Sequence, residues 1–283
     1  MSRQTAPHVR FGTFAGVSIR YADSAGGGPQ EPVVVLTSPW PESVYAFTPI
    51  WATLAERARL VAIDLPGFGA SERRDELLSP RAMGGFLSRF IAEAGLGTPH
   101  LVAPDVGTSA ALFAAAACPE RVASVIVGTG AAAVPLRLGE PLASWVLDPD
   151  LDKYRTMDPR VIVGAALDKI AGGIPDAVRA DYLACYDGDR FVESMRYVRR
   201  YPEELPALAE LLPRIARPVT IIQGRDDGVV PLANVEFLDE RLPVSRAVIV
   251  DAGHFVWEEE PATYASVILD SIAGAGTQEG RAA

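Results

Sequence analysis

Cysteine and histidine are scarce in this chain of 283 residues, which has two cysteines and three histidines. The cysteines, Cys118 and Cys185, lie far apart in the sequence and do not form the dense framework of a disulfide-stabilised secreted protein. They predict free thiols in a reducing compartment. Because the histidines and cysteines do not occur at the spacing of metal ligands, the sequence implies no metal and no other cofactor.

Long apolar runs and an excess of positive charge are also missing. The longest apolar run, around residues 110–118, is about half as long as a bilayer span requires. The first residues, MSRQTAPHVRFGTF, lack the apolar core of a signal peptide, so a cytoplasmic location is expected. The net charge of −10 and the isoelectric point near 4.9 argue against nucleic acid and anionic membranes as partners.

The chain does contain a regular alternation of short apolar runs and helix-like segments. Strand-like runs occupy residues 8–14, 17–23, 32–37, 58–64, 99–104, 122–128, 217–224 and 245–253. Helix-like segments occupy residues 79–95, 107–117, 232–241 and 261–273. Continuous apolar strands that alternate with helices predict an α/β protein whose mostly parallel sheet is covered on both faces.

The pattern changes between Pro135 and Leu212. This stretch has no buried-strand pattern and reads as short helices broken by proline and glycine. We therefore expect one α/β core, residues 1–134 and 213–283, interrupted by a helical insertion at 135–212. The insertion contains five tyrosines: Tyr154, Tyr182, Tyr186, Tyr197 and Tyr201.

Three polar side chains follow predicted strands, at the sheet edge where open α/β sheets place their ligands. They are Asp105 in APDVG, Asp227 in GRDDGVVP and His254 in DAGHFVWEEEP. A carboxylate between an apolar strand and an apolar helix is costly unless it is used. Two simpler readings stay open here, a helix N-cap role for Asp105 and the use of Asp226 in place of Asp227.

This order of nucleophile, acid and histidine resembles that of the α/β-hydrolases. The strings SPWPES (38–43) and DLPGFGAS (64–71) add to the resemblance, which covers nearly all of the chain. It implies the α/β-hydrolase fold, with the helical insertion as a cap. A homodimer is common in such folds, and we expect one here on that basis alone.

Asp105 occupies the position at which most of these enzymes carry serine. An aspartate there resembles the epoxide hydrolases and the haloalkane or haloacid dehalogenases. A carboxylate attacks a saturated carbon without needing a base, and the resulting ester is cut by water. The resemblance implies that His254 activates this water and that Asp227 orients the imidazole.

The loop that would form the oxyanion hole departs from its relatives. They carry His-Gly-aromatic-Pro, whereas this chain has Ser38-Pro39-Trp40-Pro41. By position, the donors would be the backbone N–H groups of Trp40 and Val106, and neither is a proline. A cis peptide bond before Pro41 would match the relatives.

The halide-binding groups of the dehalogenases are absent from the corresponding positions. Val106, directly after the nucleophile, has no side-chain donor, the insertion has no histidine, and the helix after Asp105 has no arginine. Epoxide hydrolases instead use cap tyrosines to protonate the opening oxygen. By spacing, these would be Tyr197 and Tyr154, with Trp145, Tyr182 and Tyr186 as further donors or pocket walls.

The sequence thus favours a hydrolase that opens a small apolar or aromatic epoxide to a vicinal diol. Two alternatives remain at this point. One is a dehalogenase that uses the same ester, and the other is a catalytically silent fold that binds a small ligand. The altered oxyanion loop motivates the silent fold, while the intact set of Asp105, Asp227 and His254 counts against it.

Overall fold

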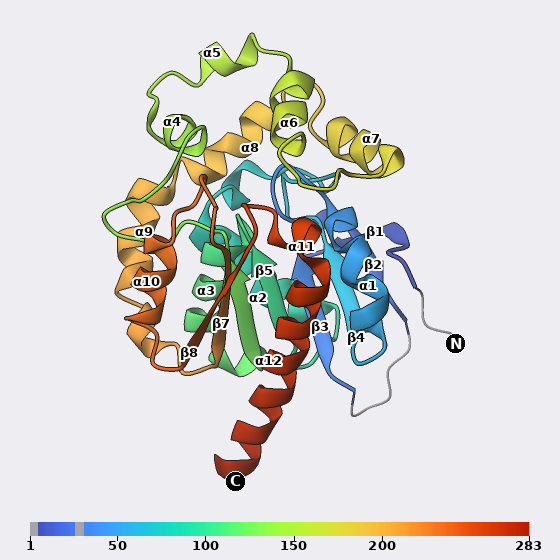
Figure 1. The fold of residues 1–283 in the computed structure, drawn as a ribbon, viewed down its shortest axis with the longest axis vertical. Helices are drawn as coiled ribbons and strands as arrows, with labels where there is room; N and C mark the ends of the chain where they lie inside the picture. The colour runs from blue at the N-terminus through green and yellow to red at the C-terminus, as the bar shows by residue number, and fades with distance from the viewer. Residues whose placement is uncertain (1–4, 26–30, 283) are drawn as a thin grey trace.

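An eight-stranded sheet forms the centre of the molecule (Figure 1). The computed structural model describes residues 5–25 and 31–282. The strands lie in the order β1-β2-β4-β3-β5-β6-β7-β8. Strands β3 to β8 run parallel to one another, and β2 runs antiparallel to both of its neighbours, β1 and β4. The strands are β1 (Val9–Phe14), β2 (Val17–Asp23), β3 (Val33–Thr37), β4 (Arg59–Ile63), β5 (His100–Pro104), β6 (Ser124–Gly128), β7 (Val219–Gly224) and β8 (Ser245–Val250).

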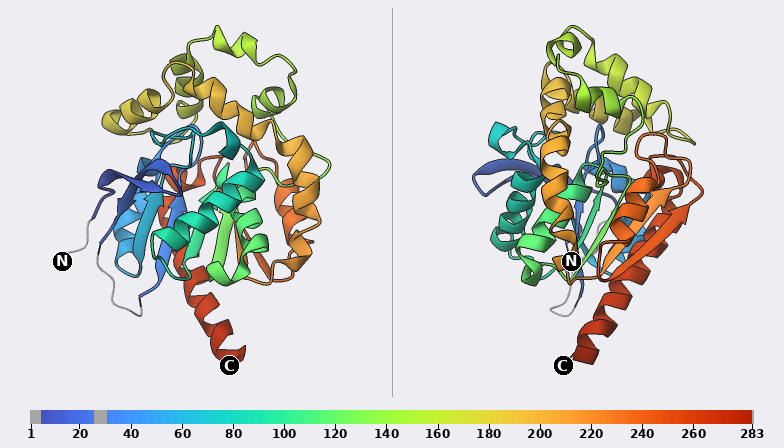
Figure 2. Two further views of the ribbon diagram at one scale, coloured as in Figure 1. Left: turned by 180° about the vertical axis from the view of Figure 1, so that it is seen from behind. Right: turned by 90° about the vertical axis from the view of Figure 1, so that its left-hand side faces the viewer.

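Helices cover both faces of this sheet, as the continuous apolar strands predict. Every residue of β5, β6 and β7 is buried, which requires apolar cover on both sides. On one face α2 (Pro80–Glu93) packs against α3 (Gly107–Ala117), and on the other α1 (Thr48–Ala55) packs against α12 (Pro261–Ala282) (Figure 2). Two further helices of the core are α10 (Ala233–Asp239) and α11 (Val256–Glu259). The predicted α/β-hydrolase fold is therefore confirmed.

The chain between β6 and β7 forms a separate helical layer over the core, which we call the cap segment (135–212). Its helices are α4 (Leu142–Leu147), α5 (Asp152–Arg155), α6 (Pro159–Leu167), α7 (Asp176–Cys185), α8 (Arg190–Val198) and α9 (Tyr201–Ala209). The last of these, α9, leaves the layer and packs beside α2 and α3 of the core. None of the helices in the described ranges is both long and apolar enough to cross a membrane.

A buried arginine ties the cap segment to the sheet. Arg20, on β2, donates from Nε to Asp64 Oδ2 at 2.6 Å and from Nη1 to Asp181 Oδ1, on α7, at 2.7 Å. Ser43 Oγ donates to the other oxygen of Asp181 at 2.7 Å. Since Arg20 and Asp64 are almost completely buried, their charges depend on one another and on this contact with α7.

Candidate active site

Asp105 lies on a sharp turn between β5 and α3, with a positive φ of 51°. Only close packing by small neighbours allows this turn. A Cβ atom on Gly107 would lie 2.3 Å from Thr37 Oγ1, and one on Gly130 would lie 2.3 Å from the Asp105 carbonyl oxygen. The Asp105 N–H donates to the Gly128 carbonyl at 2.9 Å. The left-handed backbone is a strained, over-determined conformation of the kind found at functional sites.

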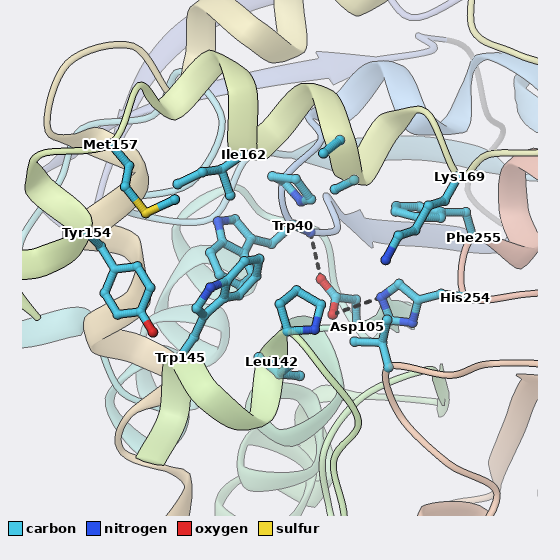
Figure 3. Close-up of a pocket in the computed structure, with 15 residues that line it drawn as sticks. Trp40, Asp105, Leu142, Trp145, Tyr154, Met157, Ile162, Lys169, His254 and Phe255 are labelled. Carbon is cyan, nitrogen blue, oxygen red and sulfur yellow. Dashed lines mark hydrogen bonds and ion pairs between the residues drawn. The ribbon is translucent and has the colours of Figure 1, made fainter. Parts of the chain in front are cut away.

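The two oxygens of the Asp105 carboxylate have different surroundings (Figure 3). Oδ2 accepts a hydrogen bond from the backbone N–H of Trp40 at 2.6 Å, and the N–H of Val106 also binds the carboxylate. Oδ1 lies 3.8 Å from His254 Nε2, which is too far for a direct hydrogen bond. The two predicted oxyanion donors therefore face Asp105. The Trp40–Pro41 bond is cis, as expected.

The second carboxylate holds the imidazole. Asp227 Oδ2 lies 2.9 Å from His254 Nδ1, which leaves Nε2 toward Asp105. Asp227 Oδ1 accepts from the N–H groups of Val229 and Val230, both at 2.8 Å, so this carboxylate is fixed. Asp226 is exposed, and it therefore does not supply the acid. With the proton on Nδ1, Nε2 is free to accept one.

A further residue, Gln223, holds the Asp227 carboxylate and was not predicted from the sequence. Gln223, at the end of β7, donates from Nε2 to Asp227 Oδ2 at 2.8 Å and to the Val230 carbonyl at 2.9 Å. It is buried, and a polar residue inside an otherwise apolar strand is the signal that could have revealed it.

Burial and charge shift the pKa values of Asp105 and His254. Burial raises the pKa of Asp105 to about 6, although the charge of His254 and the Trp40 N–H act in the opposite direction. Burial acts to lower the pKa of His254, but the charge and hydrogen bond of Asp227 outweigh it, so the net shift is upward. A nucleophile and a base with perturbed pKa values in one cavity are typical of active sites.

A cavity of about 300 Å³ opens over Asp105 between the core and the cap segment. Its wall is mostly apolar, and its charged side chains are those of Asp105, His254 and Lys169. The other lining residues are Trp40, Pro41, Pro141, Leu142, Trp145, Tyr154, Met157, Ile162, Ala165, Ala166, Val229 and Phe255. This wall suits a small, largely apolar ligand.

Of the five cap residues predicted to face the substrate, Trp145 and Tyr154 line this cavity. Trp145 packs edge-on against Trp40 at a centroid distance of 5.3 Å. The Tyr154 ring lies at the end of the cavity away from Asp105 (Figure 3), and its hydroxyl donates to Asp148 Oδ2 at 3.4 Å.

The placement of Tyr197 corrects the prediction that it protonates the substrate. Tyr197 is fully buried on α8 and does not line the cavity. Its hydroxyl donates to the Val106 carbonyl at 2.7 Å. The tyrosine therefore supports the turn behind the nucleophile, because its helix presents this side chain to α3 and not to the cavity.

Tyr182 and Tyr186 are likewise not cavity walls. The hydroxyl of Tyr182 donates to Glu258 Oε1 at 3.1 Å, and that of Tyr186 donates to the Glu42 carbonyl at 3.1 Å. Tyr186 also accepts from the Gly69 N–H at 3.1 Å. Tyr182 thus fastens α7 to α11, and Tyr186, directly after α7, is fastened to loops of the core, which explains their burial.

Lys169 was not singled out in the sequence. It follows α6 and lines the cavity opposite the Tyr154 end (Figure 3). The chain has two lysines, at positions 153 and 169. This rarity is the feature of the sequence that could have drawn attention to Lys169. In the described ranges, no three His, Cys, Asp or Glu side chains gather as metal ligands.

The fold and this site together define a hydrolase class. The chain belongs to the alpha/beta hydrolase family, whose family model matches residues 27–267. A curated relative is the pimeloyl-[acyl-carrier protein] methyl ester esterase of Aeromonas hydrophila subsp. hydrophila. It is 26% identical over 84% of this chain and 94% of its own length.

Two solved structures share the fold at lower sequence identity. The epoxide hydrolase CorEH superposes with a TM-score of 0.78 at 20% identity, over 94% of this chain and 99% of its own. A loop variant of the haloalkane dehalogenase DbeA from Bradyrhizobium elkanii superposes with a TM-score of 0.76 at 19% identity, over 98% and 99%. At these identities, the two similarities establish the fold alone.

Proposed function

We propose that this hydrolase opens an apolar epoxide to a vicinal diol through an ester on Asp105. The observation that carries the proposal is the asymmetry of the Asp105 carboxylate. Oδ2 is held by the Trp40 N–H, while Oδ1 faces the cavity and is 3.8 Å from His254 Nε2. A serine hydrolase would need the histidine to remove a proton from its nucleophile, whereas a carboxylate attacks directly.

In the first step, Oδ1 attacks an epoxide carbon and forms a C–O bond as the ring C–O bond breaks. The electron pair of that bond goes to the ring oxygen, which takes up a proton. Tyr154 is the cap phenol that lines the cavity, and we propose its hydroxyl as the donor of this proton. Since its ring lies at the end of the cavity away from Asp105, the phenol would have to leave its contact with Asp148 and turn toward the ring oxygen to do so.

In the second step, water attacks the Asp105 carboxyl carbon. His254 Nε2 takes the proton of this water, and Asp227 stabilises the imidazolium that forms. The negative charge that develops on Oδ2 is already surrounded by the N–H groups of Trp40 and Val106, so little reorganisation is needed. Collapse of the intermediate expels the diol, which receives the proton from His254, and restores the carboxylate.

The test is to trap the ester. In His254→Gln, Asp105 keeps its ability to attack but the water is no longer activated. After incubation with a panel of epoxides, haloalkanes and haloacids, intact-mass spectrometry should show a gain equal to one whole epoxide. Peptide mapping should place it on Asp105, and the double variant Asp105→Asn/His254→Gln should stay unmodified.

Other results of the same experiment contradict the proposal. A gain equal to a haloalkane or haloacid minus hydrogen halide would make the protein a dehalogenase. Absence of any adduct, together with tight binding of a panel compound that is not turned over, would favour a silent binding fold.

A further inference from the structure

A single unpaired cation faces the cavity. Lys169 is the one lysine or arginine among the residues that line the cavity, and its side-chain nitrogen is directed toward His254 (Figure 3). It is exposed and also lines a second hollow beside His254. Lys169 therefore lies at the mouth of the active-site cavity, where an incoming ligand would pass it.

Three other basic residues of the cap segment are paired with carboxylates. Lys153 pairs with Asp148, Arg160 pairs with Asp187 at 2.7 Å, and Arg179 pairs with Asp168 at 2.7 Å. In the part of the chain that the structure describes, the Lys169 ammonium has no hydrogen-bond or ion-pair partner. Its charge is thus available to a ligand.

The backbone around Lys169 is fixed although its side chain is free. The Lys169 N–H donates to the Ala166 carbonyl at 3.2 Å. The next residue, Ile170, is buried, and the preceding Asp168 is held by Arg179. The position of the lysine at the cavity mouth is therefore set by the fold.

The surroundings of Lys169 are strongly acidic. Asp105 and Asp227 lie at the bottom of the site, and Glu140, Asp226 and Glu259 line the neighbouring hollow. An anionic ligand that approached the Asp105 carboxylate would be repelled by these groups. A neutral ligand would not need a cation here, whereas an anionic one would need a compensating charge at this place.

We propose that Lys169 binds a carboxylate of the substrate. This inference rests on the proposed function and refines it: the epoxide carries a carboxylate at the Lys169 end and an apolar or aromatic body toward Trp145 and Met157 (Figure 3). The electrophilic carbon lies between them, over Asp105. One ammonium supplies a single positive charge among these acidic groups, so it balances one carboxylate, whereas a phosphate group carries a charge of about −2.

The kinetic test compares two epoxides that differ in one group. These are trans-3-phenyloxirane-2-carboxylate and trans-2-methyl-3-phenyloxirane, in which a methyl group replaces the carboxylate. We expect the wild type to prefer the carboxylate in kcat/KM. Lys169→Met should reduce the ratio of the two kcat/KM values by roughly 10- to 100-fold, mainly through KM, because a charge-assisted hydrogen bond is lost. Lys169→Arg should restore part of the ratio.

Arg160→Met is the matched control, because it removes a positive charge from α6, the helix that precedes Lys169, and Arg160 does not line the cavity. The control should keep the wild-type ratio. A wild type without preference for the carboxylate, or an equal loss for both substrates in Lys169→Met, would overturn the assignment.

A binding measurement separates this proposal from the proposed chemistry. Calorimetry with the unreactive pair 3-phenylpropanoate and 3-phenylpropanamide should show tighter binding of the acid by the wild type, and no such difference in Lys169→Met. If this result holds but His254→Gln forms no epoxide adduct, the anion site stands and the epoxide reaction does not. If the wild type binds both compounds equally, Lys169 is not an anion receptor.

Discussion

At the scale of single residues, the chemistry depends on the charge of Asp105. Its pKa of about 6 results from burial, which the His254 charge and the Trp40 N–H only partly offset. The protonated acid cannot attack a carbon. The rate of ester formation, measured by rapid quench in a single turnover, should therefore rise with pH with a midpoint near 6 and level off above it.

The pH dependence of ester formation should shift in His254→Gln. Because the charge of His254 lowers the pKa of Asp105, its removal moves the midpoint of ester formation above that of the wild type. A midpoint near 4 in either protein, the value of an exposed aspartate, would contradict the buried carboxylate.

The two tyrosines first expected to be acids should respond differently to loss of their hydroxyls. Tyr154→Phe should slow ester formation by roughly 10²-fold if the phenol donates the proton. Tyr197→Phe leaves the Val106 carbonyl without its donor, so it should lower the free energy of unfolding by about 1–3 kcal/mol. Rapid quench and urea denaturation measure the two effects. An unchanged rate in Tyr154→Phe would show that the proton has another source.

At the scale of elements, the strand pattern was the most informative part of the sequence. Strands with continuous apolar runs had to be parallel and buried, and their carboxyl ends brought Asp105, Asp227 and His254 to one edge. The backbone donors Trp40 and Val106 could also be predicted from their positions. Trp40 lies in the loop after β3 that resembles the oxyanion loop of the α/β-hydrolases, and Val106 directly follows Asp105.

The cap segment could not be predicted in the same way. Its short helices have no sheet to define which face points inward, so a tyrosine's sequence position does not fix its direction. A turn of a short helix decides whether Tyr197 faces α3 or the cavity. The short helices α1 and α11 were also missed, since their apolar residues form no clear helical period.

Between the oxyanion loop and α11, two carboxyl groups lie in a largely buried position. Trp257 Nε1 donates to Glu42 Oε2 at 2.8 Å, and the Tyr182 hydroxyl donates to Glu258 Oε1 at 3.1 Å. Burial, and then the charge of Glu258, raise the pKa of Glu42 well above its usual range, and burial raises that of Glu258 to about 7.

These shifts predict a pH-dependent stability. The folded pair keeps a proton that unfolded glutamates release near pH 4.5, so the free energy of unfolding should fall as pH rises from about 4.5 to about 7. Glu42→Gln keeps an acceptor for Trp257 without the charge. It should reduce this fall by about 1–3 kcal/mol in urea titrations at pH 5 and pH 8. Equal slopes for both proteins would contradict the raised pKa values.

At the scale of the whole molecule, the cap segment and the core are joined by Arg20. Its guanidinium spans Asp64 of the core and Asp181 of α7. Asp181→Asn removes the outer charge and leaves the buried pair of Arg20 and Asp64 in place. Amide hydrogen exchange in α6 and α7 should become faster, while exchange in β5 and β6 should not change.

Asp187→Asn is the control for this experiment, because Asp187 pairs with Arg160 where both side chains are exposed. Such a surface pair contributes little to stability. Exchange in Asp187→Asn should match the wild type. If both variants or neither variant show faster exchange in α6 and α7, the Arg20–Asp181 contact does not hold the cap segment on the core.

The unequal treatment of the two Asp105 oxygens also has an isotopic consequence. In the proposed reaction, the attacking oxygen Oδ1 leaves with the diol and an oxygen from water replaces it, while Oδ2 stays bound to the Trp40 N–H. During many turnovers in ¹⁸O-labelled water, the Asp105 peptide should therefore gain one heavy oxygen and never two. The first diol released by each molecule should be unlabelled at the new hydroxyl, and every later diol should be labelled. By this mechanism, Asp105 retains its original Oδ2 through all turnovers, while Oδ1 is replaced in each catalytic cycle.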